Sequence, residues 1–125
     1  MTSSAEDCLE AIFVLSERLG KVKSIDIVNH MNVSKPTISR KMKHFHDNGY
    51  ITFDNNRCIY LTEKGAEIAR RIHERHTMFS KVLVAIGVSE AQAHEDACKM
   101  EHAVSRETFD CIKGLYDKLL EMNMR

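Results

Sequence analysis

The sequence predicts a mainly α-helical fold in which a helix-turn-helix with a β-hairpin wing precedes a set of longer helices. Three observations predict this fold. Residues 24–49 hold two apolar-periodic segments separated by a tight turn. Residues 50–61 hold two short segments in which apolar and polar residues alternate. In the remaining segments the apolar residues recur at helical spacing. We therefore expect a winged unit at residues 1–72 and a helical unit at residues 73–125, with a long helix from about residue 63 spanning both.

The first predicted helix begins at a serine and ends at Gly20. Either Ser3 or Ser4 can cap it, because a serine hydroxyl accepts a hydrogen bond from the free N–H groups of the first turn. Asp7 and Glu10 share one side near its start, where acidic side chains are usually partners of the helix dipole. A different side carries the apolar residues Leu9, Ile12, Phe13 and Leu19.

The next two predicted helices form the helix-turn-helix. Ser24 caps the shorter one, and Ser34 caps the other, whose first turn contains Pro36 at a position where a missing N–H costs nothing. An exposed polar and basic half on the helix after such a turn is typical of a recognition helix in the DNA major groove. The alternative is a solvated basic helix face. The polar residues between its apolar positions are Lys35, Thr37, Ser39, Arg40, Lys41, Lys43 and His44.

Residues 50–61 predict a two-stranded hairpin, which would form a wing directly after the helix-turn-helix. Its apolar residues alternate with polar neighbours, and Asp-Asn-Asn between the two segments is typical of a turn. Arg57, beside the tip, would reach a phosphate or the minor groove. The candidate DNA-binding residues are Ser34, Lys35, Pro36, Thr37, Ser39, Arg40, Lys43 and Arg57.

The charge distribution agrees with nucleic-acid binding by the first unit. The formal net charge is zero, because 18 basic residues balance 18 acidic residues. Residues 21–50 nevertheless carry six Lys or Arg against two acids, whereas residues 76–125 carry six against eight. The two halves therefore differ in sign.

Three more helices follow the wing. Thr62 caps a long helix that ends at Gly87, and Ser89, with Gln92 as a capping-box partner, starts the next. Ser105 caps the last helix, whose apolar strip we expect to bury against a second copy of the chain. The strip consists of Phe109, Ile112, Tyr116, Leu119 and Leu120.

One helix face gathers four side chains of metal-ligand types. At about 100° per residue, His94, Cys98, Glu101 and His102 fall on one face about 100° wide. Burying such a face without water costs free energy, because each polar group then needs a partner. A metal ion can be the common partner of all four groups. The alternative is a solvated face that happens to be rich in His and Glu. His76, on the long helix, is by itself either a hydrogen-bonded core residue or a ligand.

Other motifs exclude several classes of protein. The N-terminal residues lack a basic and apolar leader, and the longest apolar run, residues 82–86, is far too short for a membrane span, so we expect a cytoplasmic protein with no membrane partner. Without a C-x-x-C pair, Cys8, Cys58 and Cys111 are interpreted as packing or surface thiols. We expect no enzyme and no small-molecule substrate, because H-E-x-x-H, a nucleophile elbow and a Gly-rich phosphate loop are all missing.

Several of these segments together resemble a known family. The matching segments, in chain order, are residues 6–12 (EDCLEAI), 33–39 (VSKPTIS), 61–65 (LTEKG), Arg75-His76 and 94–105 (HEDACKMEHAVS). The chain resembles the metal-dependent transcriptional repressors of the diphtheria toxin repressor and manganese transport regulator type (DtxR/MntR). The resemblance implies a winged-helix DNA-binding domain, a helical dimerisation domain and a divalent metal ion held where the two meet.

The resemblance also implies a ligand set. Asp7 and Glu10 stand where manganese-type members place two carboxylate ligands, and His76 stands at their histidine. Cys98 takes a position that is glutamate in some manganese sensors and cysteine in the iron type.

Glu101 and His102 match ligands of both types. His94, a further candidate, matches an ancillary-site histidine of the iron type. Ser80 replaces an ancillary-site glutamate, and the SH3-like third domain that completes that site is not in the sequence, so a full ancillary site is not expected.

The function that the resemblance implies is a homodimeric repressor, activated by Mn²⁺ or Fe²⁺, that binds a palindromic operator upstream of metal-uptake genes. An ion joining ligands of both units would set the spacing of the two recognition helices. The alternative that remains open is a winged-helix regulator in which Cys98 is a redox switch and metal is incidental.

Overall fold

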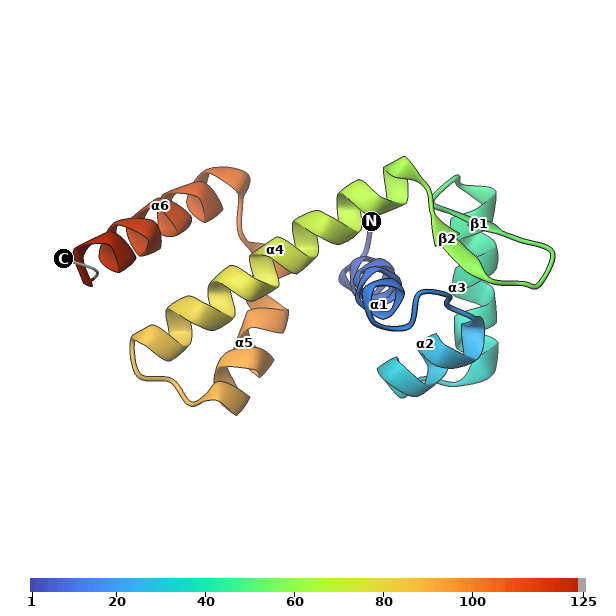
Figure 1. The fold of residues 1–125 in the computed structure, drawn as a ribbon, viewed down its shortest axis with the longest axis horizontal. Helices are drawn as coiled ribbons and strands as arrows, with labels where there is room; N and C mark the ends of the chain where they lie inside the picture. Colours follow the sequence, from blue (N-terminus) through green and yellow to red (C-terminus); the bar gives the residue numbers. More distant parts are fainter. Residues whose placement is uncertain (124–125) are drawn as a thin grey trace. The chain divides into compact units, whose positions relative to one another are not determined.

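The computed structural model describes residues 1–123, which form six α-helices and one antiparallel hairpin (Figure 1). The predicted fold class is confirmed. Within these residues, no helix has the length and low polarity that crossing a membrane requires. In chain order the elements are α1 (Ser3–Leu19), α2 (Ser24–Met31), α3 (Lys35–Asp47), β1 (Ile51–Phe53), β2 (Ile59–Leu61), α4 (Glu63–Ala85), α5 (Glu90–Ala103) and α6 (Arg106–Asn123).

The chain divides into two compact units, and the division falls inside α4. The first unit covers Met1–Ile72, and the second begins at His73. Each unit has a cluster of buried apolar side chains of its own.

Most helices begin after a short polar side chain, and four predicted caps are confirmed. Each cap accepts a hydrogen bond, at 3.1–3.3 Å, from the backbone N–H three residues further on. These caps are Ser34, Thr62, Ser89 and Ser105.

Two predicted helix caps were wrong, by one or two residues in α1 and by one residue in α2. The cap of α1 is Thr2, whose Oγ1 accepts from the Ala5 N–H at 3.1 Å, so Ser3 is already helical. Ser24 is the first residue of α2, and the Asp26 carboxylate accepts from the Lys23 N–H at 2.8 Å instead. At α1 three neighbouring residues, Thr2, Ser3 and Ser4, have side chains that can cap a helix, so the sequence alone does not decide between them.

The core of the first unit joins α1, α2, α3 and the hairpin. Leu9 and Ile12 from α1, Ile38 and Phe45 from α3 and Ile59 from β2 are all 0 or 1% exposed. Packing of this kind holds α3 by its apolar side and leaves its polar side outward.

The two strands of the hairpin pair with each other, and β2 also bonds to the segment before α2. Ile51 pairs with Leu61 in an antiparallel register, and Ile59 donates its N–H to the Val22 carbonyl at 2.7 Å. Where the hairpin passes into α4, Gly65 packs so closely that a Cβ there would overlap the carbonyl oxygen of Tyr50.

The core of the second unit is small and aromatic. Phe79 of α4 meets Phe109 of α6 edge to face, with ring centroids 5.9 Å apart, and Ala97 of α5 packs beside them. Phe109, at one end of the predicted strip, thus lies inside this unit, whereas Leu119 at its other end is 47% exposed. Leu119 forms an outward apolar row with Leu115 and Met122, which are 60 and 68% exposed.

Two residues that were predicted on apolar helix faces lie at helix ends and are exposed. Leu19, expected on the apolar side of α1, is 51% exposed in its last turn. Ile86, expected in the stripe of the long helix, follows the end of α4 and is 71% exposed.

Candidate metal centre and nucleic-acid interface

In the second unit, α4 and α5 bring the predicted metal-ligand types together around His76. Its Nδ1 lies 2.9 Å from Glu101 Oε2 and 3.7 Å from the Cys98 sulfur. Its Nε2 lies 3.0 Å from Nδ1 of His94, and the two imidazole rings meet edge to face with centroids 4.6 Å apart. Both nitrogens of one imidazole therefore face other potential ligands.

The helical spacing of α5 explains why this face assembles. His94, Cys98, Glu101 and His102 follow one another at i, i+4, i+7 and i+8, as the sequence predicts. Glu101 is fully buried, and its Oε1 lies 3.4 Å from His102 Nε2. A buried carboxylate is stable only with positive or proton-donating partners, and imidazoles are suited to that role.

The donor atoms lie near the separations that a transition-metal ion requires. Ligand atoms of His76, His94 and Cys98 all lie within 4.8 Å of one another. Bonds of about 2.0–2.3 Å to nitrogen and sulfur place the donors of a tetrahedral site roughly 3.3–3.8 Å apart. Small side-chain adjustments would therefore allow these three residues to share one ion.

The two remaining ligand candidates belong to the first unit. Asp7 and Glu10 lie one turn apart on α1, and both are half-buried. The neighbouring Glu6 forms an ion pair with Arg71, at 3.2 Å.

The three cysteines that the sequence left unassigned lie in different surroundings. Cys8 and Cys58 are buried in the first unit, whereas Cys111 is exposed on α6. Burial raises the pKa of the Cys8 thiol to about 11, so this group stays protonated at neutral pH and is a poor ligand or nucleophile.

The sequence analysis named Arg75 only as part of a matching segment and missed its role as a buried cation near the donor cluster. Arg75 is 8% exposed, and its Nη1 donates to the carbonyls of Glu101, at 3.2 Å, and Val104, at 2.6 Å. These carbonyls belong to the C-terminal end of α5, where the unpaired acceptors of a helix lie. Arg75 therefore ties the ligand-bearing end of α5 to α4.

The predicted DNA-binding residues of α3 form an outward, polar surface in the first unit. Ser34 caps the helix, and its hydroxyl lies 2.8 Å from that of Thr37, which in turn accepts a weak hydrogen bond from Arg40 at 3.5 Å. Lys43 reaches Asp47, at 3.5 Å. Exposed residues in this set are Ser34, Lys35, Pro36, Ser39, Arg40 and Lys43, and Thr37 is half-buried.

The wing presents Arg57 by means of a tightly bonded turn. Asp54 Oδ1 accepts from the N–H groups of Asn56 and Cys58, both at 2.9 Å, and its Oδ2 accepts from the Tyr60 hydroxyl at 3.1 Å. Arg57 has a φ of 65°, and its guanidinium lies over the Phe53 ring at 4.5 Å. The hydrogen bonds of Asp54 thus hold a backbone conformation that a non-glycine residue seldom adopts.

Acid should loosen this turn. The N–H of Cys58, more than the other donors, holds the pKa of Asp54 below its ordinary range. A carboxyl whose folded-state pKa is lowered stabilises the fold above its unfolded pKa, and that contribution is lost as the pH falls below about 4.

In Asp54→Asn, this pH-dependent contribution should disappear. We would follow the amide resonances of the wing by NMR between neutral pH and pH 3. The parent should show changes at low pH that the variant does not, whereas identical titrations in both would contradict the assignment.

Comparisons with known families match two separate models to the chain, which meet between residues 59 and 62. Residues 1–59 match the family model described as the iron-dependent repressor N-terminal DNA-binding domain. Residues 62–121 match the iron-dependent repressor metal-binding and dimerisation domain. The chain therefore belongs to the iron-dependent repressor family, whose members are metal-dependent transcriptional repressors. The resemblance to the DtxR/MntR type is confirmed.

Curated relatives are transcriptional regulators. An uncharacterised HTH-type transcriptional regulator of Methanocaldococcus jannaschii is 33% identical over 120 residues, which are 94% of this chain and 96% of the relative. The transcriptional regulator MntR of Escherichia coli O6:H1 is 33% identical over 108 residues, which cover 86% of this chain and 70% of the relative.

Solved structures of metal-dependent regulators have the same fold as this chain. The manganese regulator SloR superposes with a TM-score of 0.81 at 28% identity, and the metal-dependent transcriptional regulator MtsR with 0.84 at 26%. Each alignment covers 94% of this chain but 55% of the solved chain. This chain therefore spans about half the length of those two proteins.

Proposed function

We propose that this protein is a metal-activated, DNA-binding transcriptional repressor of metal-homeostasis genes. The observation that carries the proposal is the cluster of His76, His94, Cys98 and Glu101 in a chain whose other unit is a winged helix-turn-helix. The names of the relatives support it, since they include MntR and a manganese regulator. The comparisons do not support the alternative of a cysteine redox switch.

Asp7, Glu10, His76, Cys98, Glu101 and His102 are the proposed ligands, with His94 as a further one. A bound divalent cation would supply positive charge that holds these groups in one arrangement. Because Asp7 and Glu10 belong to α1 of the DNA-binding unit, their engagement would bias the position of that unit. Metal binding and DNA binding would then strengthen each other by the same factor.

We propose further that the repressor acts as a homodimer on a palindromic operator. The outward apolar row of Leu115, Leu119 and Met122 on α6 offers a surface suited to a second copy. In a two-fold dimer the two α3 helices would read half-sites a helical turn or a multiple apart.

The choice of metal depends on opposing preferences within the donor set. Carboxylates such as Asp7 and Glu10 suit Mn²⁺, whereas the Cys98 sulfur favours Fe²⁺ and later transition metals. We propose Mn²⁺ or Fe²⁺ as the physiological ion, and the manganese-regulator relatives support Mn²⁺.

Metal removal should therefore weaken DNA binding strongly. We expect metal-free protein, prepared with a chelator, to bind a selected operator duplex about 100-fold more weakly than protein saturated with Mn²⁺ or anaerobic Fe²⁺, which corresponds to a coupling of about 2.7 kcal/mol. Fluorescence anisotropy against free metal measures this, and sedimentation of the same samples should give a dimer with and without metal. Metal-independent binding would refute the proposal.

The same titration on Cys98→Glu tests the role of the sulfur. With only oxygen and nitrogen ligands, the half-activating concentration of Mn²⁺ should fall relative to that of Fe²⁺. An unchanged ratio would show that the Cys98 side chain does not set the metal preference.

A further inference from the structure

An ion pair joins the start of α1 to α4 within the first unit. Nη2 of Arg71 donates to Oε2 of Glu6 at 3.2 Å, between residues that are 65 positions apart in the sequence. The Glu6 side chain is 14% exposed, and that of Arg71 is 44% exposed. A mostly buried carboxylate depends on its partners far more than a carboxylate in solvent does. The proposed function assigns no role to this pair.

Glu6 lies in the segment of α1 that carries two proposed metal ligands. Asp7 is the next residue, and Glu10 follows one turn after Glu6, on nearly the same side of the helix. Three carboxylates so close together repel one another, and the positive charge of Arg71 offsets part of that repulsion. Holding Glu6 in place therefore also holds the backbone from which Asp7 and Glu10 extend.

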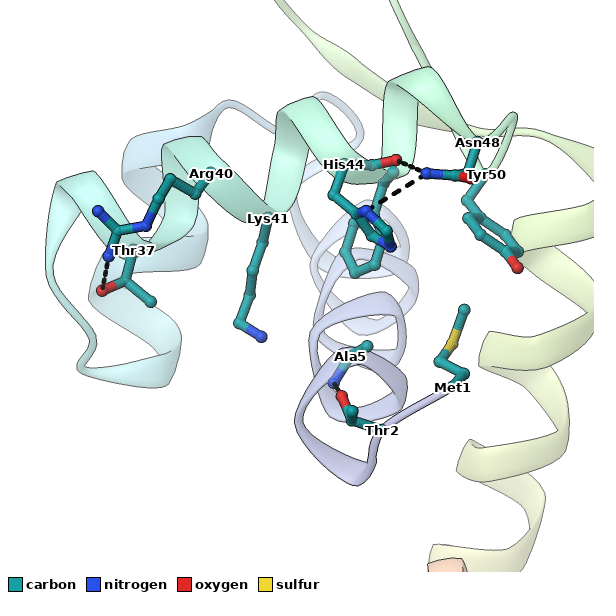
Figure 2. A pocket seen from close by; sticks show the side chains of 10 residues that line it. Met1, Thr2, Ala5, Thr37, Arg40, Lys41, His44, Asn48 and Tyr50 are labelled. Carbon is teal, nitrogen blue, oxygen red and sulfur yellow. Dashed lines mark hydrogen bonds between the residues drawn. The ribbon is translucent and has the colours of Figure 1, made fainter.

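This end of α1 is mostly exposed. Residues 1–4 are exposed, and the fully buried side chains of the helix begin at Cys8. Figure 2 shows the end from close by: the Thr2 hydroxyl accepts from the Ala5 N–H at 3.1 Å, and Lys41 extends from α3 towards the first turn. A cap of this kind stabilises the helix but does not attach it to a neighbouring element. The ion pair with Arg71 supplies such an attachment.

A second arginine of α4 holds the other ligand-bearing segment. Arg75 follows Arg71 by one turn, and its Nη1 donates to the carbonyls of Glu101 and Val104 at the end of α5. Because α4 is one continuous helix, the two arginines have a fixed spacing along it. Within the first unit, α4 is thus bound to α1 through Arg71, and within the second unit it is bound to α5 through Arg75.

We propose that Arg71 is a positioning residue for metal activation: its pair with Glu6 holds the turn of α1 that bears Asp7 and Glu10, so that a bound cation can engage the DNA-binding unit. The inference rests on the proposed function and names the contact on which its coupling depends. Without the pair, this turn samples more positions, and the cation must order it on binding at a cost in conformational entropy. Part of the free energy that couples metal binding to DNA binding is then lost.

Loss of the pair should affect this coupling more than it affects metal affinity. The ligands on α4 and α5 remain, so the DNA-free protein still binds the ion. Arg71 also repels a nearby cation, and removing its charge favours metal binding slightly, because a side chain nearly half exposed is screened by solvent. These two effects oppose each other, and we expect the Mn²⁺ affinity of the DNA-free protein to change by less than about threefold.

The test measures the affinity of the full-length protein for an operator duplex with and without Mn²⁺. In the parent the ratio of the two affinities should be about 100-fold, and in Arg71→Gln and Glu6→Gln it should fall to about 20-fold, since a charge-assisted pair with one mostly buried partner contributes roughly that difference. The double variant should lose no more than either single variant, because all three remove one interaction. Arg71→Lys keeps the charge and should restore part of the ratio.

The matched control is Arg70→Gln, which removes the neighbouring positive charge from an exposed position of α4. It should keep the parental ratio. Calorimetry gives the Mn²⁺ affinity of each DNA-free variant, and thermal unfolding verifies that each is folded. Metal-free affinity for the duplex should equal that of the parent in every variant. If Arg71→Gln fails to fold, Glu6→Gln decides.

The outcomes separate this inference from the proposed function. A parent whose DNA binding does not respond to metal overturns both. A parent that responds, with Arg71→Gln and Glu6→Gln variants that keep its ratio, overturns only the role of Arg71. Equal losses of metal-free and metal-bound affinity would show that the pair merely maintains the fold and would also overturn that role. A loss of the ratio in Arg70→Gln as large as that in Arg71→Gln would overturn it as well, since the effect would then come from charge alone.

Discussion

Glu101→Gln should raise the metal concentration needed for half-maximal DNA binding by at least about 100-fold, or about 2.7 kcal/mol. The substitution keeps the shape of the side chain but removes the only buried negative charge that faces His76 among the described residues of the second unit. An amide is a weak ligand for a divalent cation, so the cluster loses the group that best offsets the charge of the ion. Calorimetric titration with Mn²⁺ and anisotropy with an operator duplex would measure the two effects.

The control for this variant is Glu95→Gln, which removes an exposed carboxylate from the same helix. It should leave metal affinity within about twofold, because an exposed charge outside the cluster is screened by solvent. Equal metal affinities for the parent and Glu101→Gln would exclude Glu101 as a ligand.

Arg75→Met should destabilise the second unit by about 2–4 kcal/mol. The guanidinium is buried and donates to the carbonyls of Glu101 and Val104, and it stacks over Phe109 with its Cζ 5.5 Å from the ring centre. Methionine fills much of the space but leaves two carbonyls at a helix end without this donor, at a cost of about 1–3 kcal/mol for each buried group. The midpoint of urea unfolding measures the change.

Two companion variants isolate the hydrogen bonds from the charge. Arg70→Met, on an exposed position of α4, should change stability by less than about 0.5 kcal/mol. Arg75→Lys keeps the charge but has one point donor in place of the planar fork, so an intermediate loss is expected. A stability of Arg75→Met equal to that of Arg70→Met would contradict the role that we assign to Arg75.

Much of the fold and one face of the site follow from local patterns. Capping residues such as Ser34 and Ser89 lie directly before periodic apolar segments, and each marks a helix start in the structure. The spacing of His94, Cys98 and Glu101 needs only helical periodicity to place them on one face. Periodicity alone left His76 undecided between a core residue and a ligand, and its contacts in the structure lie with that face.

What the sequence did not predict depends on contacts between segments that are distant in the chain. Arg75 enters the sequence analysis only beside His76 in a matching segment, and neither periodicity nor capping indicates what its side chain binds. Its role arises because the carbonyls that it binds lie 26 and 29 residues further on. The pair of Glu6 and Arg71 likewise joins residues that are 65 positions apart, so helical periodicity could place each of them on a helix but could not identify its partner.

Gly65 has a consequence for how this chain can diverge. The Tyr50 carbonyl occupies the space that a side chain at position 65 would need. This carbonyl also accepts a hydrogen bond from the Thr62 N–H, at 3.0 Å, where the hairpin passes into α4. Even alanine would push backbone against backbone there, and no rotamer can relieve a clash at Cβ. Gly20 and Gly49 have open space around them, so their constraint is one of torsion that asparagine can partly meet. In proteins that keep this junction, we therefore expect the exposed residues of α3 to vary while position 65 remains glycine.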